Sequence, residues 1–236
     1  MALPVINVPT YEVPVPSTKD KITFRPFLVK EEKILLLALE DGGDESIARA
    51  IKQIIHNCTF EKVDVDSLAT FDLEFVFLRI RAKSVGEIAK VQVLCEDDGE
   101  TYVEAEVDLE KVEVDFPEGH TNNIELTDSI NVHFNYPDMA DMYTGIQEGQ
   151  TAIDFSLDLI SKSIFQIIEG ETVHERADFS DKELVVFLES LTSDQFSKLQ
   201  QFFETMPRLS HIVEVTNPNT KKKNKVTMEG LNSFFV

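Results

Sequence analysis

Histidine and cysteine are the residue types in this chain that could carry catalysis or bind a transition metal. The five histidines are spread along the sequence, roughly one to each predicted element: His56, His120, His133, His174 and His211. His56 and Cys58 are two residues apart in a predicted helix, so they do not share a face, and we expect His56 at the surface and Cys58 in the core. Cys95 is the single cysteine of its predicted hairpin, whereas a zinc ribbon needs four ligands.

Enzyme motifs are missing from the sequence. The chain has no glycine-rich loop to cradle phosphate, no Gly-x-Ser-x-Gly nucleophile turn and no helix with paired zinc-binding histidines. A hydrolase assembled from residues far apart in the sequence is the alternative, because pattern analysis does not detect convergent sites. Nothing in the spacing supports it. The sequence therefore predicts a protein that is not an enzyme and that uses no metal and no cofactor.

The segment from Glu96 to Glu118 concentrates negative charge, with eleven acidic residues and one lysine. Around Gly99 it does not match a calcium-binding EF-hand loop, because Leu94 and Ala105 occupy two positions that would have to be ligands. The segment is a solvated face, a weak site for a divalent cation, or a surface that steers a basic partner by long-range attraction, and the solvated face is favoured over the cation site. The candidate residues are Glu96, Asp97, Asp98 and Glu100.

A second candidate contact lies where Arg25-Pro26-Phe27 precedes a helix that begins with charged residues. Proline fixes the backbone at this corner. One interpretation is structural, with Phe27 packed and Arg25 capping local carbonyl groups. The other is that both side chains touch a partner, because arginine and aromatic residues dominate interface energetics. The charged residues assigned to the same candidate surface are Lys30, Glu31, Glu32 and Lys33.

The charge balance excludes several classes of function. The 236 residues include 22 basic and 43 acidic side chains, a net charge of −21. Nucleic-acid binding requires Lys and Arg to displace phosphate counterions, and anionic membranes attract basic surfaces, so both partners are disfavoured. Two cysteines cannot build a disulfide framework, which indicates a reducing compartment. The N-terminus lacks the features of a signal peptide, and no apolar run is long enough to span a membrane.

Apolar periodicity predicts the elements that would position these candidates. Residues 1–28 are predicted to form a proline-rich arm and a short strand. The arm is either a frayed tail or a segment that docks onto another surface, and its apolar residues favour docking. Helices are predicted from Val29 to Leu39 and from Asp44 to Cys58. A third helix, capped by Asp66 and running to about Lys83, is apolar on two sides, which indicates a helix sandwiched at the centre of the core.

The middle of the chain has strand character. A hairpin is predicted to turn at Asp97-Asp98-Gly99, with a weak extension through Val112, Val114 and Phe116. A further strand covers residues 130–134. After it, apolar residues from Ile153 to Ile168 recur at helical spacing and predict one long helix that Gly170 closes.

The last sixty residues combine two helices with a hairpin. Capping boxes at Ser180 and Thr192 predict the starts of the two helices, and Pro207 ends the second. A terminal hairpin is predicted around Asn217-Pro218-Asn219. Its turn carries the chain's single basic cluster, which consists of Lys221, Lys222, Lys223 and Lys225.

Together these elements predict an α+β fold with a helical N-terminal core, an acidic β-hairpin insertion and a C-terminal helical cluster with a terminal hairpin. The expected divisions are 1–28 for the arm and short strand, 29–87 for the helical core, 88–136 for the acidic β region, and 137–236 for the helical C-terminal region with its hairpin.

Two stretches of the first half resemble a known family. Residues 11–18, YEVPVPST, with residues 24–40, FRPFLVKEEKILLLALE, are similar to baseplate proteins of contractile-tailed, T-even-like bacteriophages. Residues 71–87, FDLEFVFLRIRAKSVGE, resemble that family's second signature. The most specific part is the Arg25-Pro26-Phe27 motif together with the charged residues at 30–33. The second half of the chain carries no motif that places it.

The resemblance implies a non-enzymatic baseplate hub subunit or a factor that assembles the hub during tail morphogenesis. Its partners would be other phage hub or tail proteins, in the host bacterial cytoplasm during assembly and in the virion baseplate if the protein stays in the particle. The alternative from another class is an acidic interaction protein that mimics nucleic acid and occupies a basic partner. The acidic run favours that alternative, although strand-like valines and a tyrosine interrupt it.

Overall fold

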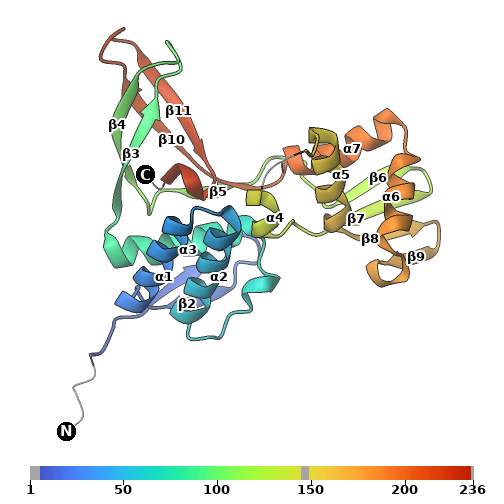
Figure 1. The fold of residues 1–236 in the computed structure, drawn as a ribbon, viewed down its shortest axis with the longest axis horizontal. Coiled ribbons are helices and arrows are strands. Elements are labelled where there is room, and N and C mark those ends of the chain that lie inside the picture. Colours follow the sequence, from blue (N-terminus) through green and yellow to red (C-terminus); the bar gives the residue numbers. More distant parts are fainter. Residues whose placement is uncertain (1–5, 145–148, 235–236) are drawn as a thin grey trace. The chain divides into compact units, whose positions relative to one another are not determined.

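The structure is a computed structural model that describes residues 6–144 and 149–234 (Figure 1). The chain forms two compact units, of which unit 1 comprises residues 1–115 and 208–236 and unit 2 comprises residues 116–207. The fold is a mixture of helices and small antiparallel sheets, so the predicted α+β class is confirmed. The grouping differs from the sequential divisions predicted above, because the terminal hairpin belongs to the same unit as the N-terminal helices.

The N-terminal strap of unit 1 packs on its own chain. Strand β1 (Tyr11–Pro14) pairs antiparallel with β2 (Lys21–Phe24). Between them, the Ser17 backbone N and Oγ donate hydrogen bonds of 3.0 and 2.5 Å to the buried Asp72 carboxylate. Residues 6–10 are exposed, and residues 1–5 of the predicted arm lie outside the described residues. The buried side chains of the strap are Val13, Val15, Ile22 and Phe24.

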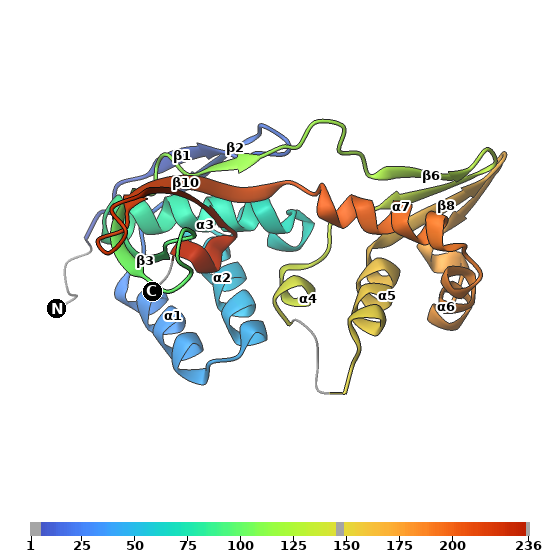
Figure 2. The same ribbon diagram turned by 90° about the horizontal axis from the view of Figure 1, so that it is seen from above.

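Three helices form the core beside this strap. Helix α1 spans Val29–Asp41 and α2 spans Asp44–Cys58, so the first two predicted helices are confirmed. Gly42 ends α1 in the left-handed region at φ 70°, a conformation that glycine adopts without a Cβ clash. Helix α3 (Thr70–Val85) runs along the strap, with α1 and α2 on its other side (Figure 2).

Helix α3 has the central position that its apolar residues predict. It is buried on both of its apolar faces, as the side chains of Leu73 on one face and Leu78 on the other illustrate. The prediction that Asp66 caps this helix is wrong. Asp66 lies in a separate 3-10 helix, η1 (Val65–Ser67), and the N-cap of α3 is Ala69.

Two hairpins complete unit 1 and lie side by side (Figure 1). One consists of β3 (Ile88–Leu94) and β4 (Tyr102–Asp108), and the other of β10 (Arg208–Thr216) and β11 (Lys223–Glu229). A short strand, β5 (Glu113–Asp115), pairs with β10, so the predicted extension of the first hairpin joins the terminal hairpin instead. The short 3-10 helix η3 covers Leu231–Phe234. The buried hairpin residues include Val91, Val93, Ala105, Val107, Val213, Val215 and Met228.

Unit 2 is a four-stranded antiparallel sheet with helices packed on it (Figure 2). The strands, in their order across the sheet, are β6 (Asn123–Thr127), β7 (Ile130–Phe134), β8 (Ile164–Glu169) and β9 (Thr172–Glu175). The helices are α4 (Met139–Thr144), α5 (Ala152–Ser163), η2 (Arg176–Asp178), α6 (Asp181–Glu189) and α7 (Ser193–Glu204). Strand and helix residues share one core that includes Leu126, Val132, Phe134, Ile160, Ile164, Leu184, Leu188, Leu199 and Phe202.

The predicted long helix from Ile153 to Ile168 is wrong in its second half. The helix ends at Ser163, and β8 follows immediately between β7 and β9. Isoleucines at helical spacing also suit a strand, and both neighbouring strands supply hydrogen-bond partners that the sequence alone does not reveal. Gly170, at φ 59°, makes the tight turn into β9. The capping boxes predicted at Ser180 and Thr192 are both present.

Candidate functional site

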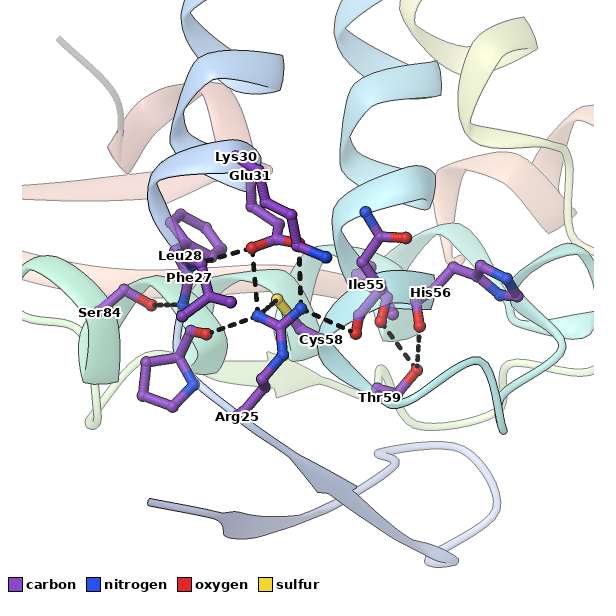
Figure 3. Close-up of polar contacts among 12 residues, drawn as sticks. Arg25, Phe27, Leu28, Lys30, Glu31, Ile55, His56, Cys58, Thr59 and Ser84 are labelled. Atoms are coloured by element: carbon purple, nitrogen blue, oxygen red, sulfur yellow. Dashed lines mark hydrogen bonds and ion pairs between the residues drawn. The ribbon is translucent and has the colours of Figure 1, made fainter. Parts of the chain in front are cut away.

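The Arg25 guanidinium lies between the start of α1 and the end of α2 (Figure 3). Its Nη1 and Nη2 donate to the two Glu31 carboxylate oxygens at 3.1 and 3.0 Å. Nη1 also donates to the Pro26 carbonyl at 3.0 Å, and Nη2 to the Asn57 carbonyl at 3.3 Å. The Glu31 carboxylate accepts a further hydrogen bond of 2.9 Å from the Leu28 backbone. We call Arg25, Glu31 and these partners the Arg25–Glu31 cluster.

The Arg25–Glu31 cluster is interior. The exposed fraction is 8% for Arg25 and 0% for Glu31. Burial alone would raise the pKa of Glu31, but the hydrogen bonds from Arg25 and Leu28 and the guanidinium charge outweigh it, so the pKa is lowered. The hydrogen bond to Glu31 likewise raises the pKa of Arg25. The two side chains therefore stay ionised and neutralise each other inside the fold.

Contacts of Phe27 and Cys58 connect the corner around the cluster to α3 and α2. The Phe27 backbone donates a 2.8 Å hydrogen bond to the Ser84 hydroxyl at the end of α3, and its ring lies 5.8 Å from the Phe77 ring. The Cys58 Sγ lies 3.7 Å from Arg25 Nη1, and burial raises the pKa of its thiol to about 11. Cys58 is a core residue, as its sequence position predicts. Pro26 is buried as well, so the motif joins α1 to α2 and α3.

The opposite face of α1 is solvent-exposed and apolar. Its apolar side chains are 81% exposed at Val29, 54% at Leu36 and Leu37, and 47% at Leu39. Lys30, Glu32 and Lys33, which the sequence assigned to a candidate contact, are exposed on the same helix. We call Val29, Glu32, Lys33, Leu36, Leu37 and Leu39 the α1 outer face. The sequence indicates this exposed apolar face through the run from Ile34 to Leu39, which has more apolar positions than one buried face of a helix needs.

The acidic turn of the β3–β4 hairpin binds the turn of the β10–β11 hairpin. Asn217 Nδ2 donates to the carboxylates of Asp97 and Asp98 at 2.9 and 2.7 Å. Asn224 Nδ2 donates to Asp97 at 2.9 Å, and its Oδ1 accepts a 3.0 Å hydrogen bond from the Asp97 backbone. The Thr220 hydroxyl also donates to Asp97. We call these five residues the carboxylate–amide cluster.

In this cluster, two acidic residues of the run accept hydrogen bonds from within the chain. Hydrogen bonds from Thr220, Asn217 and Asn224 lower the pKa of Asp97, and those from Thr101 and Asn217 hold the pKa of Asp98 far below its usual range. The two aspartates that are candidates for steering a partner therefore accept hydrogen bonds that connect the two hairpins. Glu96 and Glu100 are exposed. The sequence did not show this pairing because the partners are more than a hundred residues apart.

Of the histidines, His120 makes the contacts that are best defined. The His120 ring contacts the Thr205 hydroxyl at 3.0 Å and the Tyr136 hydroxyl at 3.1 Å, and burial lowers its pKa. Among the residues that the structure describes, no group of histidine, cysteine and acidic side chains is arranged to hold a metal ion.

The comparisons with known proteins bear on the whole chain. Over the described ranges, none of the helices combines the length and apolar character needed to cross a membrane. No curated protein and no solved structure shows significant similarity to the chain. A model of the family described as T4 bacteriophage base plate protein matches residues 8–236, so the resemblance drawn from two motifs of the first half extends over nearly the whole chain, and the protein belongs to this family.

Proposed function

We propose that this baseplate protein is a non-enzymatic subunit of the baseplate hub or a factor that assembles the hub of the contractile tail. We further propose that the α1 outer face is its contact with another baseplate protein. The observation that carries the proposal is the exposure of Val29, Leu36 and Leu39 on a helix whose other side is anchored by a buried ion pair. Contiguous exposed apolar surface on a rigid element is typical of protein–protein interfaces.

The charges on the α1 outer face suit a protein partner. Glu32 and Lys33 lie among the apolar side chains, so the face is mixed in sign. A polar rim of this kind gives an interface its register, while the apolar side chains supply most of the affinity. The nucleic-acid mimic has less support, because Asp97 and Asp98, at the start of the acidic run, hydrogen-bond within the chain.

The test is complementation of a phage that lacks this gene. Leu36→Glu combined with Leu39→Glu should abolish infectious progeny and assembled baseplates while leaving the purified chain folded, because both side chains are exposed. The matched control is Ile212→Glu on β10, which is 60% exposed in the same unit. We expect this control to complement normally. Normal baseplates with the double variant would refute the proposed contact.

The two forms of the proposal differ in where the protein ends up. A hub subunit should be present in purified virions at a fixed ratio to other baseplate proteins. An assembly factor should co-purify with hub intermediates from infected cells and be missing from virions. Quantitative mass spectrometry of both fractions separates the two forms, and absence from both fractions would contradict the proposed function altogether.

A further inference from the structure

A cavity of about 300 Å³ opens on unit 2 between the sheet and helix α6. Strands β7 and β8 contribute Ile130 and Ile167 to its wall, and α6 contributes Leu184 and Phe187. Phe179, just before α6, closes another side. Five of its eight lining residues are therefore apolar, and the cavity is at the small end of the range found for ligand pockets. We call it the α6 pocket.

The mouth of the α6 pocket is acidic. Glu169, at the end of β8, and Glu183, in the first turn of α6, are its exposed carboxylates. His174 Nε2 lies 3.8 Å from a Glu169 oxygen. Arg176, the nearby arginine, is engaged by the Phe179 carbonyl and by Asp181, so it does not neutralise the mouth.

The charge of the whole unit extends this pattern. Residues 116–207 contain seventeen acidic and four basic side chains, so unit 2 carries −13 of the chain's net charge of −21. An excess of this kind attracts basic segments and repels acidic ones before any contact forms. The acidic mouth lies within that field, and the apolar cavity beneath it offers a place to bury one large side chain.

We propose that the α6 pocket receives a bulky apolar side chain, phenylalanine or leucine, from a partner segment in which lysine or arginine flanks that residue. The buried side chain supplies affinity by desolvation, and the flanking cations meet Glu169 and Glu183 at the mouth. This deepens the proposed function by giving the chemistry of a second contact, and it rests on that function only for the identity of the partner as another baseplate protein.

The experiment titrates the full chain with the acetylated, amidated peptide Gly-Lys-Phe-Lys-Gly and follows isoleucine and leucine methyl signals by NMR. Saturable shifts should centre on Ile130, Ile167 and Leu184. The peptides Gly-Lys-Ser-Lys-Gly and Gly-Glu-Phe-Glu-Gly should bind roughly tenfold more weakly or worse, since one lacks the apolar anchor and the other is repelled. Equal binding of the serine peptide would overturn the proposal, because it would mean charge attraction without use of the cavity.

Matched variants test the mouth. Glu169→Gln with Glu183→Gln should weaken binding of the phenylalanine peptide roughly tenfold and flatten its salt dependence, because exposed charges act within about 8 Å at physiological ionic strength. Glutamine at 183 preserves the capping box with Ser180. The control, Glu171→Gln with Glu189→Gln, removes the same charge from exposed positions outside the pocket lining and should bind as the wild type does.

Two other outcomes would also overturn the proposal. Shifts in the same methyl signals that depend on protein concentration, without peptide, would mean that a second copy of the chain occupies the pocket. Peptide-induced shifts confined to residues outside the lining would mean that the pocket is not the binding site. Because the titration uses the purified chain alone, its failure leaves the complementation result for the α1 outer face unaffected.

Discussion

The Arg25–Glu31 cluster and the carboxylate–amide cluster both hold carboxylates within unit 1, but by different means. Glu31 is fully buried and faces a guanidinium, so charge is balanced by charge. Asp97 and Asp98 lie at the turn of a hairpin and are held by neutral amides and hydroxyls. The first cluster joins α1 to α2 near the N-terminus, and the second joins two hairpins that are far apart in the sequence.

The difference shows that burial determines how much stability is lost when a carboxylate loses its partner. A buried ion that loses its partner has no water to replace it, whereas a carboxylate at a turn can be solvated when a neutral donor is removed. The two clusters should therefore differ in the size of the response to mutation and in its pH dependence. The predictions below use this contrast.

Removing Arg25 should have the largest effect. Arg25→Ala leaves the Glu31 carboxylate buried without its counter-charge, so the free energy of unfolding should fall by about 3–5 kcal/mol. Urea denaturation followed by circular dichroism measures the loss. Lys33→Ala, a cation exposed on the same helix, is the control and should change stability by less than about 0.5 kcal/mol. A wild-type unfolding curve for Arg25→Ala, combined with failed baseplate assembly, would instead favour the interpretation of Arg25 as a partner contact.

Loss of an amide from the second cluster should cost less. Asn217 is buried and bridges both aspartates, so Asn217→Ala should lower the free energy of unfolding by about 1–3 kcal/mol. Asn219→Ala is the matched control, because Asn219 is exposed and donates one 3.0 Å hydrogen bond to Thr101. The control should stay within about 0.5 kcal/mol of the wild type in the same urea experiment. Equal losses in the two variants would indicate that the cluster does not hold the hairpins together.

The pH dependence of these losses should separate the clusters. The folded-state pKa values of Asp97 and Asp98 lie below the ordinary aspartate value of 3.8, so their contribution is complete above that pH and disappears as the pH falls through the folded values. The stability loss in Asn217→Ala should therefore shrink only below about pH 4. In Arg25→Ala the counter-charge is gone, so burial should raise the pKa of Glu31 above 4.5, the ordinary value for glutamate. As the pH falls from 7, the stability loss of this variant should therefore begin to shrink before the pH reaches 4.5. Urea denaturation from pH 7 to pH 3 gives both curves, and coincident onsets would contradict the distinction.

Each cluster also has a buried cysteine beside it, and the reactivity of that thiol reports local opening of the structure around the cluster. Cys58 contacts Arg25, and Cys95 directly precedes the acidic turn. Local opening should control alkylation by iodoacetamide. Arg25→Ala should speed labelling of Cys58, and Asn217→Ala that of Cys95, each by about tenfold or more for a local destabilisation above about 1.4 kcal/mol. Mass spectrometry of tryptic peptides gives both rates. Equal acceleration of both thiols in either variant would mean that unit 1 opens as a whole.

Features that depend on local interactions, such as the starts of helices, could be predicted from the sequence. The helices that begin after Ser180 and Thr192 are marked by side chains three residues apart, so their capping boxes could be recognised without knowing the fold. Helix α3 was also recognised, because apolar residues on two faces require neighbours on both sides. Its start was misjudged, since Asp66 suits the beginning of either a 3-10 helix or an α-helix.

The candidate site was only partly readable. The sequence singled out the Arg25-Pro26-Phe27 motif and the charges after it as one candidate unit, and their spacing allowed either a corner or a contact. Which side chains turn inward depends on α2, which supplies the Asn57 carbonyl and Cys58. The same packing determines the α1 outer face. When Glu31 points into the core, the opposite side of α1 is left exposed.

By itself, the sequence determined the local starts of helices, the central place of α3, the α+β class and the resemblance to baseplate proteins. Tertiary structure alone decided that Ile164–Glu169 is a strand, that the terminal hairpin joins the N-terminal unit, and that Asp97 is paired with Asn217 and Asn224. The physical reason is the range of the interactions. Capping and periodicity act over a few residues, whereas strand pairing and buried hydrogen bonds depend on which distant segments the fold brings together.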